Sequence, residues 1–438
     1  MTTSIDPASA RWHLLSLSAA AAALSDGSCS AEELTSDCLA RIRQRNAEIN
    51  AFVWVDEVGA LKAARAADRR RRSGSARSLL DGVPYAVKDN IDVNGMPTSN
   101  GICRGGAAVT DAEAVTPWAG AGMVALGKLN MHEAALGTTT ENPHFGATRN
   151  PLDPAYSAGG SSGGSGASVA DFMCPMALGS DTMGSVRLPA ASCGVFGWKP
   201  TPGVLGLGGM HLLDDELDTA GPLVRTLADM DLLMSHLGHG ERDPEPVSFW
   251  VLPELHGTPP AAELASLWEM TQSLLAPRAL VVGELHPTPL RRAALLSIEA
   301  RLSREWDADA RAHMSTALNA MLEFGDGVSD ERWDAAIASR REAGVRIAAA
   351  LETVDIVITL ASPVPPTRLG AEMVPHQADY LLAANLAGAP ALTVPAGSTA
   401  SGLPIGLQLI AAPGRDGRLL DAARTLREHG LWFEHSAG

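Results

Sequence analysis

Three segments of the chain carry side chains whose types and spacing suit covalent chemistry. An apolar run, 82–89, ends in a lysine, Lys88, followed by an aspartate. A loop at 159–166 contains only glycine and serine, and the segment 179–189 places serine, aspartate and threonine side chains within one turn. Two chemistries fit such residues: phosphate binding by a glycine-rich loop, and nucleophilic catalysis by a serine with a neighbouring base.

The details of the sequence argue against two common versions of these chemistries. No Gly-Lys-Ser or Gly-Lys-Thr follows the glycines of 159–166, and no dinucleotide-binding fingerprint fits. The pattern Gly-x-Ser-x-Gly occurs only within this glycine and serine loop, at 159–163 and 160–164, and does not form the strand-to-helix elbow that the α/β-hydrolase triad requires. A flexible linker is a further interpretation of this loop. Ordered apolar segments flank it, however, and favour a compact functional loop.

Read together, these motifs resemble the amidase signature family. That family has a Gly-Gly-Ser-Ser-Gly-Gly loop, an Asp-Thr-x-Gly-Ser turn and a Gly-x-x-Gly-x-Lys-Pro-Thr segment, which here stand at 159–164, 181–185 and 194–201. Further similar stretches lie at 130–133, 140–151, 217–222, 385–388 and 402–408. The resemblance covers residues 30–235 and 354–428, and its order and length make it specific. The upstream segment and the Ser-Asp-Thr turn resemble those of the branch with biuret-pathway hydrolases and the amidotransferase A subunit.

The resemblance assigns catalytic roles by position. Lys88 matches the family's catalytic lysine, Ser161 the bridging serine and Ser185 the nucleophile. A serine hydroxyl needs a base to take its proton. Lysine can act as that base only when neutral, so burial must lower its pKa from about 10.4 towards ~7–8. The end of an apolar strand beneath the glycine and serine loop is a suitable place for such a lysine.

The resemblance also implies how charge on the reacting oxygen is stabilised. Backbone N–H groups of Thr182, Met183, Gly184 and Ser185 are expected to face that oxygen. A cis peptide is expected between Gly160 and Ser161, and Gly160 joins the expected substrate-binding residues. The family commonly has glycine where Met183 stands. If this position needed a positive φ, methionine would be strained there; otherwise the thioether could project into the pocket.

Each assignment has a plainer structural alternative. Ser185 by itself could be a turn residue, and Lys88 could be a surface lysine paired with Asp89. Asp181 and Arg187 are interpreted as an internal ion pair that braces the turn. No metal site is expected, because the histidines lack carboxylate–histidine spacing. The five cysteines lack metal-type pairs and are interpreted as small buried apolar residues.

The surrounding sequence predicts the elements that position these residues. Helices are expected at 30–50, 56–72, 377–388 and 417–428, the first opening with a capping box at Ser30. Strands are expected at 354–360, 391–394 and 405–410. This alternation predicts an α/β protein. The resemblance implies one amidase signature domain over 1–438, with a central mixed β-sheet covered by helices on both faces and a helical insert at approximately 240–350.

Composition limits the function further. The chain has 34 basic and 50 acidic residues, a formal net charge of −16, which makes nucleic acid an unfavourable partner. No stretch approaches the ~18–20 apolar residues of a membrane span, and a cytoplasmic location is expected. The expected partner is a small-molecule amide, with no cofactor, and a homodimer is left open. Specificity is expected from the insert, 98–104 and 362–376.

The functional prediction is hydrolysis of the C–N bond of a small carboxamide or urea-like amide, through an acyl-enzyme on Ser185. Two alternatives remain at this stage. One is an amidotransferase A-type subunit that takes ammonia from glutamine with a partner subunit. The other is a non-catalytic member of the family that serves as a binding or scaffold protein.

Overall fold

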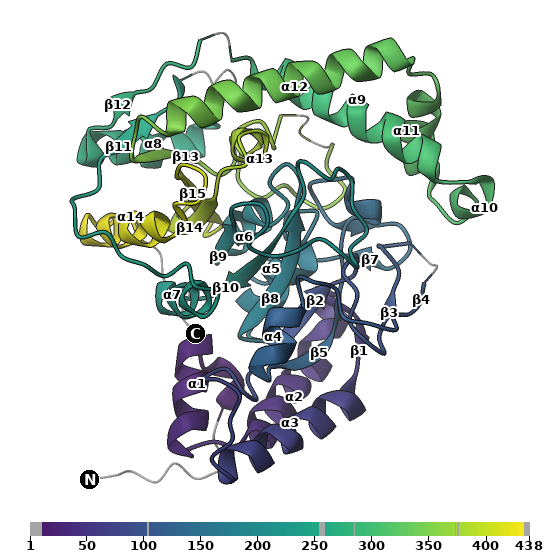
Figure 1. The fold of residues 1–438 in the computed structure, drawn as a ribbon, viewed down its shortest axis with the longest axis vertical. Coiled ribbons are helices and arrows are strands. Elements are labelled where there is room, and N and C mark those ends of the chain that lie inside the picture. The colour runs from purple at the N-terminus through teal and green to yellow at the C-terminus, as the bar shows by residue number, and fades with distance from the viewer. Residues whose placement is uncertain are drawn as a thin grey trace.

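The computed structural model describes residues 11–102, 105–253, 259–283, 285–372, 374 and 376–432 (Figure 1). The strands of these residues build one 11-stranded mixed sheet. Its order from edge to edge is β1 (Phe52–Val55), β5 (Val124–Leu129), β2 (Pro84–Lys88), β8 (Met176–Asp181), β10 (Thr219–Val224), β9 (Phe196–Lys199), β14 (Ala391–Ser398), β15 (Pro404–Ile410), β13 (Ile356–Leu360), β11 (Phe249–Val251) and β12 (Arg278–Ala279).

Strand β2 lies between β5 and β8 and runs parallel to both. Its register pairs Ala86 with Ala177 and Val87 with Leu178 of β8. The five residues of β2 are all buried, as the apolar run at 82–89 predicts. Because neighbouring parallel strands end at the same edge of the sheet, the last residues of β2 and β8 lie close together. This edge carries the chemistry described below.

Helices cover both faces of the sheet, as predicted. A Cβ added to Gly197 of β9 would lie 2.6 Å from the Cβ of Ala190, so this face carries α6 (Arg187–Cys193). The next residue, Trp198, points to the other face, where its ring is 6.5 Å from that of His239, just after α7 (Leu227–His236). Helix α14 (Asp416–Glu428) packs against α7 and against β13, β14 and β15.

The N-terminal helices gather at one end of the molecule, at the bottom of Figure 1. They are α1 (Leu17–Asp26), α2 (Ala31–Ile49) and α3 (Glu57–Arg72). The capping box predicted at Ser30 is present, because its side chain accepts from the Glu33 amide while the Glu33 carboxylate accepts from the Ser30 amide. The buried face of α2 packs on α3, β2 and β5.

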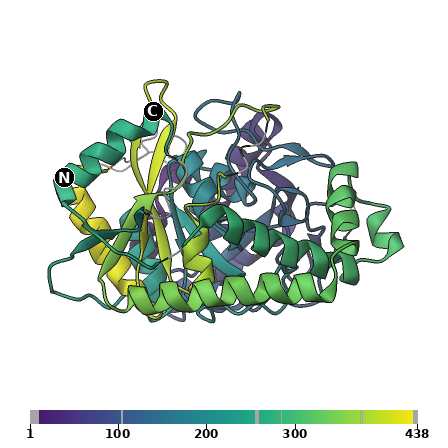
Figure 2. The same ribbon diagram turned by 90° about the horizontal axis from the view of Figure 1, so that it is seen from above.

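The predicted insert forms a helical layer at the opposite end. It contains α8 (Ala262–Leu275), α9 (Pro287–Glu305), α10 (Ala308–Arg311), α11 (Thr316–Asp326) and α12 (Asp330–Leu351). Helices α9 and α12 lie side by side across the top of the molecule (Figures 1 and 2). The same range also supplies β11 and β12, which extend the main sheet beyond β13. The sequence analysis expected no strand there.

The remaining elements are short. They are η1 (Trp12–Leu14), β3 (Pro97–Thr98), β4 (Gly106–Ala107), α4 (Thr116–Ala121), η2 (Glu133–Ala135), β6 (Glu141–Asn142), β7 (Gly146–Ala147), α5 (Gly163–Ala170) and α13 (Leu382–Leu386). Helix α13 is much shorter than the helix predicted at 377–388, because Gln377–Leu381 form turns instead.

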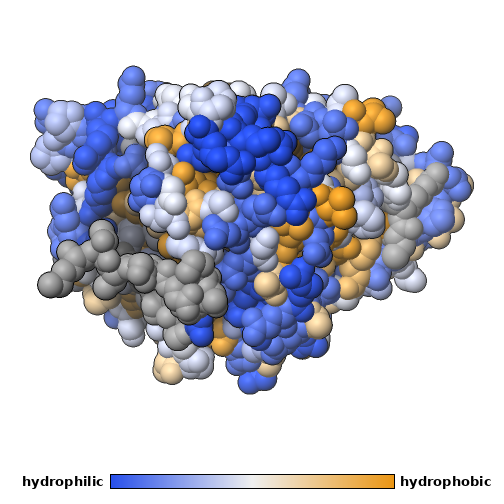
Figure 3. All heavy atoms as spheres, turned by 90° about the horizontal axis from the view of Figure 1, so that it is seen from below, coloured by the Kyte–Doolittle hydropathy of each residue, from blue (hydrophilic) through white to orange (hydrophobic). Residues whose placement is uncertain are grey.

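The largest apolar cluster spans both faces of the sheet, and a second cluster joins α9 and α12 to β13, β15 and α13. Cys29, Cys38, Cys174 and Cys193 are buried free thiols, as predicted, while Cys103 lies outside the described residues. One face of the molecule is mostly hydrophilic, with smaller apolar patches (Figure 3). No helix among the described residues combines the length and apolar character needed to cross a membrane.

Candidate active site

Lys88 stands at the carboxyl end of β2 and is fully buried. Its Nζ lies 2.7 Å from the Oγ of Ser161 and 2.8 Å from the Oγ of Ser180. Ser180 belongs to β8, so the parallel pairing of β2 with β8 accounts for this second contact. The structure thus brings Lys88 and Ser161 into direct hydrogen-bond contact.

The environment of Lys88 favours its neutral form. Burial lowers the pKa of Lys88 to about 7, against a smaller opposing effect from the carboxylates of Asp218 and Asp181. Asp89 does not neutralise Lys88, because it pairs with the buried Lys128 at 3.3 Å. The alternative of a surface lysine paired with Asp89 is therefore wrong.

Ser161 is held in a tightly packed backbone segment before α5. The Gly160–Ser161 peptide bond is cis, as expected. A Cβ at Gly160 would lie 2.7 Å from the carbonyl carbon of Thr138, so only glycine fits this close approach. The carbonyl of Ser161 accepts from the amide of His132 at 3.0 Å and from the hydroxyl of Thr140 at 3.3 Å. These bonds hold the Ser161 backbone in place and so help to position its hydroxyl next to Lys88.

Ser185 lies in the turn between β8 and α6, and Asp181 fastens that turn. The Asp181 carboxylate accepts from the amides of Gly184 at 2.8 Å and Val186 at 3.1 Å. Arg187 donates from Nη2 to the same carboxylate at 2.8 Å, which confirms the predicted internal ion pair. Burial alone would raise the pKa of Asp181, but the Arg187 guanidinium and the Asn385 amide hold this pKa well below its usual range.

The backbone at Met183 and Gly184 answers the question of strain in this turn. Gly184 has a positive φ of 115°, and a Cβ there would lie 2.3 Å from a side-chain carbon of Leu381. Met183 is absent from the residues with positive φ, so methionine is tolerated without backbone strain. The position in this turn that needs glycine is 184, where the family's Asp-Thr-x-Gly-Ser motif and this chain both have it.

The predicted oxyanion donors differ in their availability. The Gly184 amide already donates to Asp181, so it is engaged within the turn. Within the described residues, the amides of Thr182, Met183 and Ser185 donate no hydrogen bond. These three amides remain the candidates to face a developing negative charge.

A cavity of about 340 Å³ opens over this turn. Gly160, Thr182, Met183, Gly184 and Ser185 line this cavity, whereas Ser161 and Lys88 are fully buried and are not among its lining residues. The other lining side chains are mostly aliphatic. The lining residues outside the two catalytic segments are Ala135, Leu136, Gly137, Thr138, Leu188, Leu213, Arg291, Leu295, Met321, Val374 and Ala378.

The segments that carry Ser161 and Ser185 lie next to each other, but the two hydroxyls are not directly joined. Among the described residues, no hydrogen bond links their two Oγ atoms, and the neighbouring tie runs from the Ser162 amide to the Ser185 carbonyl at 3.3 Å. Catalytic hydrogen bonds often tighten only when substrate is bound. The cavity lining includes Val374 and three residues of the insert but none of the described residues of 98–102, and a role of these segments in specificity stays a prediction.

Asp218 is a buried group near Lys88 that the sequence analysis did not single out. Its carboxylate accepts from the amides of Leu213 at 2.8 Å and Asp214 at 3.4 Å. Burial raises the pKa of Asp218 to about 6. Its charge acts to raise the pKa of Lys88, so the two groups titrate under each other's influence. The Leu-Asp-Thr stretch at 217–219 was the available signal in the sequence.

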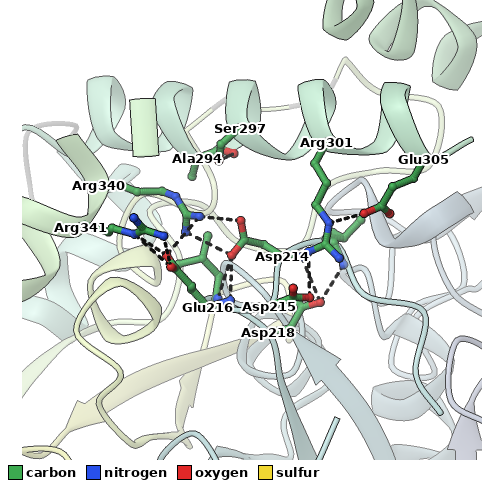
Figure 4. Close-up of polar contacts among 12 residues, drawn as sticks. Asp214, Asp215, Glu216, Asp218, Ala294, Ser297, Arg301, Glu305, Arg340 and Arg341 are labelled. Atoms are coloured by element: carbon green, nitrogen blue, oxygen red, sulfur yellow. Dashed lines mark hydrogen bonds and ion pairs between the residues drawn. The ribbon is translucent and has the colours of Figure 1, made fainter. Parts of the chain in front are cut away.

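The insert is tied to this region by charged contacts, drawn in Figure 4. Arg340 of α12 donates to both oxygens of Asp214, at 3.2 and 2.7 Å, and both side chains are nearly fully buried. Arg341 donates to Glu216, and Arg301 of α9 donates to Asp215 at 2.9 Å. The segment that carries Asp218 is therefore anchored from above by two helices of the insert.

A second anchor joins α11 to the other side of the cavity. The buried Glu133 accepts from the amide of Ser315 at 2.8 Å and also from its hydroxyl. Ser315 is the N-cap of α11, and its hydroxyl accepts from the Leu318 amide. Glu133 also contacts His144 Nε2 at 2.8 Å. One carboxylate thus links the start of an insert helix to the segment that precedes the Gly160–Ser161 loop.

The sequence of this chain is similar to those of known proteins. A family model described as Amidase matches residues 33–264 and 290–420. The chain is 35% identical over 476 aligned residues to the A subunit of the glutamyl-tRNA(Gln) amidotransferase of Pseudomonas putida (strain W619), covering 96% of this chain and 98% of that protein.

Two solved structures are similar throughout. One belongs to a vestigial protein complex described as revealing the evolutionary origins of an s-triazine catabolic enzyme. It has a TM-score of 0.87 and 29% identity, covering 96% of this chain and 100% of that one. The other is described as an amidase, with a TM-score of 0.86 and 30% identity, covering 94% and 99%.

Proposed function

The chain belongs to the amidase family, and from that premise we propose that it hydrolyses an amide bond with Ser185 as nucleophile, Ser161 as proton relay and Lys88 as base. The contact that carries the proposal is the 2.7 Å separation of Lys88 Nζ from Ser161 Oγ inside a fully buried environment. Burial that lowers the pKa of Lys88 to about 7 supplies a neutral amine at physiological pH.

In the first half of the reaction, the Ser185 oxygen attacks the carbonyl carbon of the amide. The Ser185 proton passes to the Ser161 oxygen, while the Ser161 proton passes to Lys88 Nζ, which becomes an ammonium. The negative charge on the carbonyl oxygen is met by the backbone amides of Thr182, Met183 and Ser185. Asp181 contributes by fixing the turn that presents these amides, through its bonds to Gly184 and Val186.

In the second half, the tetrahedral intermediate collapses and the C–N bond breaks. The proton held on Lys88 returns through Ser161 to the departing nitrogen, which leaves as ammonia or an amine. Water then attacks the acyl-enzyme, with the same proton path acting as base, and releases the acid and the free Ser185 hydroxyl. The path needs no metal or organic cofactor at any step.

The test is turnover of a panel of small amides, measured as ammonia or amine release. Ser185→Ala should abolish turnover while leaving the folded state intact, as judged by circular dichroism. A fluorophosphonate probe should label wild-type protein at Ser185 and leave Ser185→Ala unlabelled. Normal turnover in the alanine variant would exclude Ser185 as the nucleophile.

An amidotransferase A-type subunit is the second candidate, because a protein of that description aligns with nearly the whole chain. The composition of the cavity favours a hydrolase instead. Glutamine carries an ammonium group, and no described lining residue is a carboxylate that could pair with it. Glutaminase activity that appears or rises with a copurified second subunit would support the amidotransferase.

A non-catalytic binding or scaffold protein is the third candidate. It would have the fold without a competent nucleophile, so the fluorophosphonate probe separates it from both enzymes. The absence of backbone strain at Met183 and the unengaged amides around it support a working site. Wild-type protein that fails to label would favour the non-catalytic candidate.

A further inference from the structure

The cavity that Ser185 lines contains one charged side chain, that of Arg291, among its described lining residues. It projects from α9 in the insert, beside Leu295 of the same helix and Met321 of α11. A guanidinium in an otherwise aliphatic wall is costly to desolvate unless it has a partner. The identity of that partner is therefore informative about the ligand.

The protein itself supplies only part of the partner. Arg291 donates from Nε to Asp379 Oδ1 at 2.6 Å, and the other oxygen of Asp379 accepts from the hydroxyl of Thr288 at 2.9 Å. Asp379 is nearly fully buried and does not line the cavity. The ion pair thus fixes the orientation of the guanidinium while both Asp379 oxygens are occupied.

The two terminal nitrogens of Arg291, Nη1 and Nη2, take no part in the hydrogen bond to Asp379. Among the described residues, no hydrogen bond or ion pair involves Nη1 or Nη2. Two adjacent N–H groups at the end of a guanidinium match the two oxygens of a carboxylate. An uncharged alkyl amide would displace water from these nitrogens on binding without replacing its hydrogen bonds.

We propose that Arg291 binds a carboxylate of the substrate, so that the preferred substrates are amides that carry a carboxylate on a short aliphatic chain. This inference rests on the proposed amide hydrolysis at Ser185 and names its substrate class. The aliphatic lining accommodates the chain between the amide and the acid, and Arg291 holds its far end. Monoamides of straight-chain dicarboxylic acids have this form.

The same contacts separate this class from α-amino acids. In glutamine, an ammonium group stands next to the carboxylate and would need an acceptor close to Arg291. The neighbouring carboxylate, Asp379, has both oxygens engaged by Arg291 and Thr288. The monoamide of glutaric acid, which is glutamine without its amino group, should therefore be the better substrate.

The experiment compares kcat/KM for dicarboxylic monoamides with three to eight carbons against alkyl amides of the same lengths. For wild-type protein, kcat/KM of the best acid should exceed that of the alkyl amide of the same length by roughly 100-fold. This ratio corresponds to the free energy of a hydrogen bond between charged groups. Arg291→Met should reduce that preference to within a few-fold. Arg292→Met is the matched control, because Arg292 is the next residue on α9, is exposed and does not line the cavity. It should keep the wild-type preference.

A second variant protects the test against misfolding. Arg291→Met leaves Asp379 as a buried carboxylate without its cation, so Arg291→Met with Asp379→Asn is measured beside it. Labelling of Ser185 by the fluorophosphonate probe reports whether each variant retains a formed active site. The double variant should also lose the preference for the acid.

The position of the carboxylate is read from a second pair of substrates. One carries the acid on the acyl side, as in an anilide of glutaric acid, and the other carries it on the amine side, as in an N-acyl ω-amino acid. Dependence on Arg291 with either substrate supports the proposal and assigns the side. Equal use of acids and alkyl amides by wild-type protein, or a preference that survives in both Arg291 variants, would overturn it. Failure of the proposed function looks different: no amide is turned over and Ser185 does not label.

Discussion

The two walls of the cavity differ in how they are built. The catalytic wall consists of hydroxyls, backbone amides and buried charges from β2, β8 and the segments before α5 and α6, and its charged groups are fastened by short hydrogen bonds. The substrate wall consists mostly of aliphatic side chains and contains one arginine; its residues come from 135–138, Leu188, Leu213, α9, α11 and the segment before α13. On the proposed mechanism, proton transfer and substrate choice therefore depend largely on different residues, which can be altered separately.

The largest expected effect of a substitution in either wall is the loss of turnover when Lys88 is replaced. Lys88→Met keeps an unbranched side chain but removes the base, and should lower kcat by about 10⁴-fold or more, as expected when one member of a catalytic unit is lost. Lys62→Met is the control, because Lys62 is an exposed lysine of α3. Ammonia release under saturating substrate gives the comparison. Turnover within tenfold of wild type would remove Lys88 from the proton path.

A large loss of stability is expected when the catalytic wall loses Asp181. Asp181→Asn leaves the fully buried Arg187 without its counter-charge and should lower the free energy of unfolding by about 3–5 kcal/mol. Urea denaturation followed by circular dichroism measures the change. Asp326→Asn, which breaks a half-exposed pair with Arg311, should have a much smaller effect, because solvent screens that pair. Equal losses in the two variants would contradict a special role for the buried pair.

A smaller loss is expected where the insert meets the catalytic wall. Arg340→Met removes the partner of Asp214 and should cost about 2 kcal/mol, the lower end for a buried hydrogen-bonded charge pair. The cost is limited because Asp214 still accepts from the amides of Glu216 and Leu217. The control is Arg341→Met, since Arg341 is exposed and its ion pair with Glu216 should contribute much less to stability. A neutral effect of Arg340→Met would mean that the Arg340–Asp214 pair does not help to hold the insert in place.

The smallest effect concerns pH. Because the base is active when neutral, kcat/KM should fall as the pH drops below the Lys88 pKa of about 7. The Asp218 carboxylate raises that pKa, so Asp218→Asn should lower it and move the acidic limb of the profile to lower pH. A limb that moves to higher pH would show that Asp218 acts on Lys88 by another route. The profile of kcat/KM against pH, at constant ionic strength, makes the measurement.

The catalytic wall was predictable from the sequence because its residues sit in contiguous motifs whose spacing is local. The run at 82–89, the capping box at Ser30 and the turn at 181–185 each predicted the local structure that is found. The substrate wall was not predictable, since Arg291 and Asp379 meet only through the packing of α9 against the turns before α13. Strands β11 and β12 were missed because they are three and two residues long and carry no period of their own.

The two carboxylates that anchor the insert, Glu133 and Asp214, have a practical consequence for protein engineering. Both lie in the body of the protein and accept from residues at the start of α11 and in the middle of α12. The helical insert could be replaced by that of a related protein. If the replacement keeps the Glu133–Ser315 and Asp214–Arg340 contacts, it should bring its own ligand preference and leave the surroundings of Lys88 unchanged. A replacement insert that lacks these two contacts should loosen the segments that carry Glu133 and Asp214, which lie near Ser185.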